Sequence, residues 1–377
     1  MRKAKWISVK LIIAFIFLTI TLTTYGIQDV KIKVEDGIQV IYNPKKPSPL
    51  PGTPNEIVLT QDLCIGNEEG IEDFVFSQIR SVQVDDDGNI YALDSKEVCV
   101  KVFDRNGTHL RTFGQKGQGP GELQNPIRMH FAPEDKLLIY DSGNNRISYF
   151  TLDGKCVKEI PAGKERFSRT IPDSKGNIIV QSVSFGDTTV QEIKKLDQDL
   201  NTIFSIKAAE TERLTTTLNL LAPGLMVRVL ENDNIIWGYS LKYEIFVVDS
   251  EGKTIQKIVK DYDPIKISKE EKDRLKKETL GDRVLPPGFK ISFPKNYYPF
   301  YFIICGDDGK IYVRTYEKDK KGQFIYDVFN PEGRFIARFS LPDIDFLYIV
   351  KKNKMYTMVW EDEKGIPVVK RYDVVWK

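Results

Sequence analysis

The stretch that decides the fold is "IYALDSKEVCVKVFDRNGTHLRTFGQKGQGPGELQNPIRM", residues 90–129. Short apolar runs alternate with polar turns, and a glycine loop, residues 113–123, leads to another apolar run that begins at Pro126. A phosphate-binding loop would have to open a helix whose first N–H groups face the ligand, but a strand pattern follows here and no Gly-Lys-Ser/Thr ending is present. The loop is therefore predicted to connect two sheets, with glycines that allow positive φ.

The turn inside this stretch recurs along the chain. Its five copies are "FDRNGTHL", "TLDGKCV", "LDQDLNTI", "VDSEGKTI" and "FNPEGRFI". A second polar turn precedes each copy and occurs six times, beginning with "DDDGNIYALD" and ending with "KKNKMYTMVW". Each unit therefore contains four strands in about 40 residues, which is the size of one propeller blade.

The predicted fold is all-β, a six-bladed β-propeller of four-stranded antiparallel blades. The blades are expected at residues 77–114, 126–163, 166–207, 223–260, 298–341 and from 344 to the end. The last blade is one strand short, and "EIVLTQDL", residues 56–63, has strand alternation but no blade of its own. This N-terminal strand is expected to complete the sixth blade and close the ring, which protects the sheet edges.

Three segments divide the chain. Residues 1–26 are predicted to be a signal peptide, because basic residues precede the apolar run "LIIAFIFLTITL" and small or polar residues follow it. Stretching the run to Ile27 leaves an uncleaved membrane anchor as the alternative. Residues 27–54 form a predicted hairpin and Pro-rich linker, and residues 55–377 the propeller. The protein is expected to be exported, and so periplasmic, secreted or attached to the cell envelope.

One insertion, residues 262–299, interrupts the repeat between blades four and five. Ser268 with Glu271 forms a capping-box pattern and Gly281 follows the last good helix former, so a helix of about 12 residues is expected. A segment rich in Pro and aromatic residues follows, with Phe289 and Tyr298 among them. The insertion is expected either to rim the channel and shape a binding face or to act as a spacer.

The residues of 90–129, together with "LIYDSGNNRISYFTLDGK" at 138–155, are similar to the NHL repeat, in which an apolar strand ending in Asp precedes an "nrI.vfd..G" segment and an "fG..G.g.G.f..P" loop. The chain resembles the exported bacterial six-bladed β-propellers with NHL-like repeats. The match covers blades one and two, and only the turn spacing persists beyond them. The resemblance implies a propeller face presented to a protein or a glycan.

Charge and residue types exclude several classes. Fifty-five basic and 53 acidic residues leave a net charge of +2 without a basic cluster beyond the first ten positions, which argues against nucleic acid as a partner. The two histidines, His109 and His130, are too few for a catalytic zinc with three protein ligands. "DDDGN", residues 85–89, resembles a calcium loop, but Lys96 stands where the bidentate Glu is required. The four scattered cysteines predict no disulfide framework, although two could pair.

Arginines near the start of four successive inner strands are the candidate binding residues: Arg80, Arg128, Arg169 and Arg228. In one interpretation they converge in the channel and bind a carboxylate, a sulfate or an acidic sugar. In the other interpretation, the arginines form ion pairs between blades with Asp94 and Asp141. The imperfect alignment of the arginines favours this second interpretation. No catalytic residues and no cofactor are predicted. The leading hypothesis is a non-catalytic extracytoplasmic binding module, and the alternative is a metal-dependent hydrolase or lactonase with an ion, such as calcium, in the channel.

Overall fold

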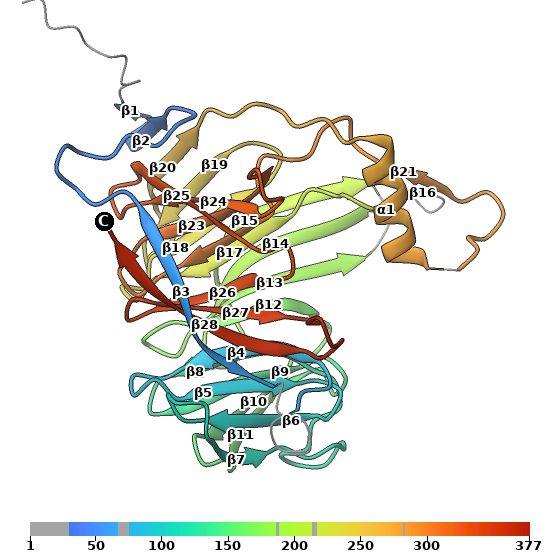
Figure 1. Ribbon diagram of the computed structural model, residues 1–377. Coiled ribbons are helices and arrows are strands. Elements are labelled where there is room, and N and C mark those ends of the chain that lie inside the picture. Colours follow the sequence, from blue (N-terminus) through green and yellow to red (C-terminus); the bar gives the residue numbers. More distant parts are fainter. Residues whose placement is uncertain (1–29, 67–74, 186–187, 213–216, 282) are drawn as a thin grey trace, which may run out of the picture.

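The computed structural model describes residues 30–66, 75–185, 188–212, 217–281 and 283–377. The predicted signal peptide, residues 1–26, lies outside the described residues. Within them the chain forms six blades and one short helix, so the predicted all-β propeller fold is confirmed. Figure 1 shows the blades arranged around a common centre.

Blades one to three are four-stranded antiparallel sheets whose strands follow one another along the chain. Blade one consists of β4 (Ile79–Val84), β5 (Ile90–Asp94), β6 (Cys99–Phe103) and β7 (His109–Phe113). Blade two consists of β8 (Pro126–Ala132), β9 (Lys136–Asp141), β10 (Arg146–Thr151) and β11 (Cys156–Pro161). Blade three consists of β12 (Phe167–Pro172), β13 (Ile178–Phe185), β14 (Thr188–Leu196) and β15 (Thr202–Glu212).

Blades four and five repeat this order, and blade six takes its last strand from the other end of the chain. Blade four consists of β17 (Leu225–Val229), β18 (Ile235–Tyr239), β19 (Glu244–Val248) and β20 (Thr254–Lys260). Blade five consists of β22 (Phe302–Cys305), β23 (Ile311–Lys318), β24 (Phe324–Phe329) and β25 (Phe335–Leu341). Blade six consists of β26 (Phe346–Lys351), β27 (Lys354–Val359), β28 (Val368–Trp376) and β3 (Ile57–Ile65).

Pairing of β3 with β28 closes the ring as expected. The two strands are antiparallel along their whole length, from Ile57 opposite Trp376 to Ile65 opposite Val369. Figure 1 shows β3, in light blue, running along β28, in dark red. The first strands of the blades form a complete circle of neighbours, β4, β8, β12, β17, β22, β26 and again β4. These six strands surround the central channel.

The core is divided among the interfaces between blades. Six clusters of buried apolar side chains are present in the described residues, and each joins two consecutive blades. The middle strands are covered on both faces, so all residues of β5 and β6 are buried. This is why these strands are apolar except for Asp94 and Lys101 and do not alternate between apolar and polar residues.

The segment before the ring was expected to be a hairpin and a linker. Strands β1 (Lys31–Glu35) and β2 (Ile38–Asn43) pair as an antiparallel hairpin. In addition, β2 pairs in parallel with β20, which extends blade four to six strands. The Asn43 amide donates to the Gly333 carbonyl at 2.9 Å and accepts from the Phe335 N–H at 2.8 Å. The segment is therefore attached to blades four and five.

The insertion contains the expected helix, α1 (Lys269–Leu280). The Ser268 side chain accepts from the Glu271 N–H at the N-terminus, and Gly281 with φ 55° is the C-cap. None of its residues is buried. Strand β21 (Lys290–Ser292), which follows it, pairs in parallel with β16 (Thr217–Asn219). Among the described residues, no helix combines the length and hydrophobicity needed to span a lipid bilayer.

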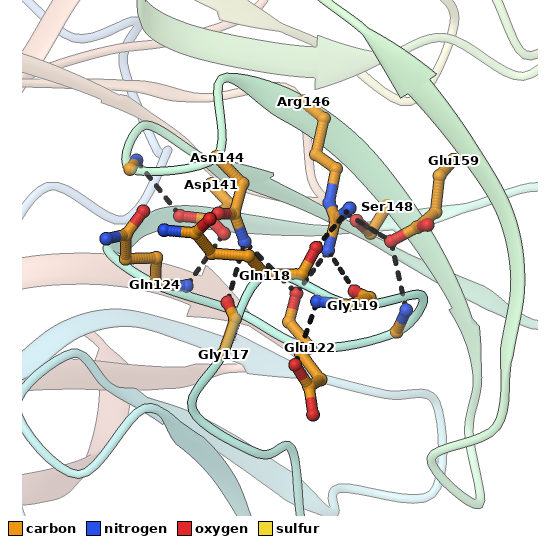
Figure 2. Close-up of polar contacts among 12 residues, drawn as sticks. Gly117, Gln118, Gly119, Glu122, Gln124, Asp141, Asn144, Arg146, Ser148 and Glu159 are labelled. Atoms are coloured by element: carbon orange, nitrogen blue, oxygen red, sulfur yellow. Dashed lines mark hydrogen bonds and ion pairs between the residues drawn. The ribbon is translucent and has the colours of Figure 1, made fainter.

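The glycine loop is the joint between β7 and β8, as predicted. Figure 2 shows its backbone held by side chains of blade two. The Arg146 guanidinium donates to the carbonyls of Gly119 and Glu122, each at 2.6 Å, and Glu159 accepts from the Gly121 N–H at 3.1 Å. Gly121 has φ 74°, which favours glycine. The N–H of Gly119 is used by Glu122 within the loop, so these groups are not arranged to bind a phosphate.

Candidate functional site

The candidate site is a cavity of about 220 Å³ in the central channel. It lies where the first strands of the blades end, and its wall includes Gln83, His130, Arg169, Arg228, Cys305 and Tyr348. These residues come from β4, β8, β12, β17, β22 and β26, so every blade contributes to the wall. A group bound here would lie within the circle of first strands.

Two arginines, Arg169 and Arg228, line this cavity, and Arg128 of the preceding blade lies next to Arg169. The guanidinium carbons of Arg169 and Arg228 lie 5.0 Å and 4.3 Å from the centre of the Phe302 ring. Arg128 donates from Nε to the Ser168 carbonyl at 2.9 Å, next to Arg169. Arg128, Arg169 and Arg228 are hereafter the arginine cluster.

No carboxylate of the described residues pairs with the arginine cluster. The hydrogen bonds of these guanidinium groups go to backbone carbonyls, from Arg128 to Ile127 and Ser168 and from Arg228 to Val227. Each of these three residues is half-buried. Like charges gathered without a counter-ion destabilise a fold, and such arrangements are concentrated at functional sites.

The pKa values of the cluster reflect this arrangement. Burial, with a smaller contribution from Arg128, lowers the pKa of Arg228 to about 10. Burial and the charges of Arg228 and Arg128 hold the pKa of Arg169 well below its ordinary value. Burial and the three arginine charges lower the pKa of His130 to about 3, so His130 is neutral at pH 7. Burial also raises the pKa of the Cys305 thiol to about 12, which leaves it protonated and a weak nucleophile.

The low pKa of His130 predicts an acid sensitivity that His130→Gln removes. The ordinary histidine pKa is about 6.5, so between that pH and about 3 the unfolded chain binds a proton that the folded chain does not. Stability therefore falls as the pH falls through this window. We expect the loss between pH 7 and pH 4 to be on the order of 1–3 kcal/mol smaller in His130→Gln. Urea unfolding at both pH values measures it, and equal losses in the two proteins would contradict the assignment.

The other predicted site residues lie elsewhere. Arg80 is exposed and does not line the cavity, because a bulge between Ile79 and Ser81 in β4 displaces it. The predicted ion pairs with Asp94 and Asp141 do not form in the described residues. Both carboxylates are fully buried and accept backbone N–H groups, for example from Ser77 at 2.6 Å and from Asn125 at 2.7 Å. They hold the connections between blades.

Sequence reasoning missed most of the cavity wall. Gln83 and His130 lie near the ends of two first strands, and a hydrogen bond of 3.5 Å links their side chains. Tyr348 lies at a bulge of β26 and approaches the Ser81 hydroxyl at 3.1 Å. Each of these residues lies a few positions before the polar turn that follows the first strand of its blade. This shared position in the repeat could have identified them from the sequence.

The structure also bears on metals and cysteines. In the described ranges, no three His, Cys, Asp or Glu side chains are grouped so that they could hold a metal ion. The Asp85 carboxylate of the "DDDGN" turn accepts the N–H groups of Asp87 and Asn89 at 3.0 and 2.8 Å, as in an ordinary turn. All four cysteines are free.

The insertion was expected either to rim the channel and shape a binding face or to act as a spacer. No residue of 262–299 lines the arginine cavity. The insertion instead borders a groove beside blade five, at the end of the blade where β22 begins. The arginine cavity lies at the other end of the same strand, where Cys305, the last residue of β22, is part of its wall.

Comparison with known proteins agrees with this architecture. The model of a family, DUF5128, described as a 6-bladed beta-propeller matches residues 69–332, more than half of the chain. The chain belongs to this family. No curated protein sequence matches this DUF5128 propeller.

Solved structures share the fold of the DUF5128 propeller at low sequence identity. A "Putative exported protein" from Bacteroides fragilis is 12% identical, with a TM-score of 0.58, and the match covers 90% of this chain and 99% of that one. A member of the duf4221 family from Bacteroides vulgatus is 11% identical, with a TM-score of 0.52, over 86% of this chain and 99% of that one. These likenesses show the fold alone.

Proposed function

We propose that this DUF5128 propeller is an extracytoplasmic binding protein whose channel holds an anionic group of its ligand. The observation that carries the proposal is the arginine cluster without a carboxylate partner. A carboxylate, sulfate or phosphate group would offset the repulsion among the guanidinium groups and accept charge-assisted hydrogen bonds from Arg169 and Arg228, which line the cavity. The neutral His130, the Gln83 amide and the Tyr348 hydroxyl line the same cavity, as do Glu231, Asp307 and Lys351. A cavity of about 220 Å³ suits one such group, not a whole macromolecule.

Export is part of the proposal because the leading basic and apolar residues are typical of a signal peptide. The ligand is then a molecule of the cell envelope or its surroundings, either a protein or a glycan that carries an acidic group. No catalytic role is assigned, because the Cys305 thiol is protonated and no nucleophile–base pair is found in the described part of the channel.

Replacing Arg169 and Arg228 together by Met tests the proposal. We expect the wild type to be stabilised by added sulfate or phosphate, by about 2.7 kcal/mol at a ligand concentration 100 times Kd, and the double variant to lose this response. The variant should fold well without added anion, because it lacks the repulsion between charges. Thermal unfolding with increasing sulfate, phosphate or citrate measures both effects.

Arg80→Ala is the matched control, since Arg80 is an exposed arginine of the first strand of blade one. It should keep the wild-type response. An anion response that survives in the double variant, or none in the wild type, would contradict the proposal. Metal analysis of the purified protein addresses the hydrolase alternative, and a stoichiometric, tightly bound calcium or zinc ion would favour that function instead.

A further inference from the structure

A second candidate site lies at the other end of blade five. A groove of about 640 Å³ runs between α1 and the adjoining edge of blade five, and the loop between β27 and β28 contributes Trp360. The groove shares no lining residue with the arginine cavity. Whatever binds in it is therefore recognised independently of the anion.

Aromatic rings are the main apolar surface of the groove. Trp360 and Tyr301 are 50% and 43% exposed, which is high for aromatic side chains of this size. Both rings contact Phe346, at centroid distances of 5.4 and 6.3 Å, so they flank one buried ring. Deeper in the groove, Tyr297 and Tyr316 stack at 4.4 Å. Two ring surfaces thus remain open to solvent above a rigid aromatic base.

The charged side chains of the groove neutralise one another. Its lining holds four basic residues, Lys266, Arg274, Arg314 and Lys318, and four acidic residues, Glu271, Glu278, Glu317 and Asp343. Most are paired within the protein: Arg274 with Glu271 and Glu278 at 2.6 Å, Lys318 with Asp343 at 3.3 Å, and Glu317 with Arg338 at 2.9 Å. The groove therefore has no net charge with which to select a charged ligand.

Arg314 supplies hydrogen-bond donors at the base of the groove. Arg314 is only 8% exposed. Its guanidinium carbon lies 4.1 Å from the centre of the Phe324 ring and 5.1 Å from the centre of the Tyr301 ring. The carboxylate that pairs with it, Asp343, is 3.8 Å away, and among the described residues its guanidinium makes no hydrogen bond. Because Arg314 lines the groove, these donors are available to a ligand oxygen.

We propose that this groove binds a neutral oligosaccharide. The apolar C–H faces of sugar rings stack on exposed aromatic rings, and the hydroxyl groups at the ring edges both donate and accept hydrogen bonds. The groove matches both properties, because its open aromatic faces are bordered by paired charged side chains. Nucleic acid would require a net positive surface. An apolar peptide helix would require a continuous hydrophobic groove, whereas here charged side chains border the rings.

The test measures binding of cellohexaose, maltohexaose, xylohexaose and mannohexaose to the full chain by calorimetry and by tryptophan fluorescence. At least one should bind, and stacking on Trp360 should change the emission. Trp360→Ala, Tyr301→Ala and Arg314→Met should each weaken binding at least tenfold, equivalent to about 1.4 kcal/mol. Unfolding curves establish that each variant is folded, which is expected for Trp360 and Tyr301 because both are about half exposed.

Phe289→Ala is the matched control, because Phe289 is a 40% exposed aromatic residue of the same insertion that does not line the groove. It should bind as the wild type does, and so should the Arg169→Met, Arg228→Met protein. The proposal is overturned if none of the four sugars binds at about 10 mM, or if the groove variants bind unchanged. Trp360-dependent binding of a casein digest without sugar binding would also overturn it and would make the groove a polypeptide site.

Discussion

Deletion of residues 55–65 is expected to abolish the cooperative unfolding transition of the propeller. This segment contains β3, which pairs with eight of the nine residues of β28. Beyond the strand, the N–H groups of Asn55 and Glu56 donate to the Lys377 carbonyl at 2.9 and 3.2 Å. Without β3, blade six loses its outer strand, and side chains such as Val374 lose the partly buried Ile57 and Leu59 from their cluster. Circular dichroism during thermal unfolding measures the transition.

Deletion of residues 30–37 provides the control for this experiment. It removes a strand too, but β1 lies at the edge of blade four and all five of its residues are exposed. This variant should unfold cooperatively, with a melting temperature close to that of the parent. Parent-like melting after deletion of 55–65 would refute the role of β3 in closure.

Asp327→Ala is expected to be the most destabilising single substitution considered, by about 3–5 kcal/mol. Asp327 is fully buried between blades four and five. Its carboxylate accepts from the Tyr243 hydroxyl at 2.6 Å and from Arg338 Nε at 2.7 Å, and it lies 3.3 Å from Lys260 Nζ. Removing the carboxylate leaves the buried Lys260 cation with no counter-ion in direct contact. The free energy of unfolding in urea is the quantity to measure.

Asp263→Ala is the matched control for the buried carboxylate. Asp263 also pairs with a lysine, Lys45, but its side chain is 80% exposed. Exposed ion pairs contribute at most about 1 kcal/mol, so this variant should be close to the wild type in stability. Equal losses in the two variants would show that Asp327 does not hold blades four and five together.

Much of the fold follows from local chemistry that repeats. The polar turns fix where strands begin and end, so six blades could be predicted without knowing how they pack. The helix followed from Ser268 and Gly281, whose capping roles depend only on their immediate neighbours. The addition of β2 to β20 could not be predicted, because a parallel edge pairing leaves no pattern in either strand.

The site was harder to predict because bulges decide which way a side chain points. A shift of one residue moves a side chain to the other face of a strand. The bulge in β4 directs Arg80 away from the cavity, whereas the bulge between Pro126 and Arg128 in β8 leaves Arg128 in the arginine cluster. The aspartates were misjudged for another reason. Asp94 and Asp141 look like partners for arginine, but backbone N–H groups of the loops between blades are closer.

The pairing of β3 with β28 also sets an order in time during synthesis on the ribosome. Ile57 emerges early, but its partner Trp376 is made more than 300 residues later. At ordinary elongation rates of about 5–20 residues per second, β3 waits roughly 15–60 seconds for its partner. Thr60, Gln61 and Asp62 are exposed polar residues in the middle of β3, and polar residues on an unpaired strand hinder pairing with other chains. The strand that completes the propeller thus has a composition that tolerates this delay.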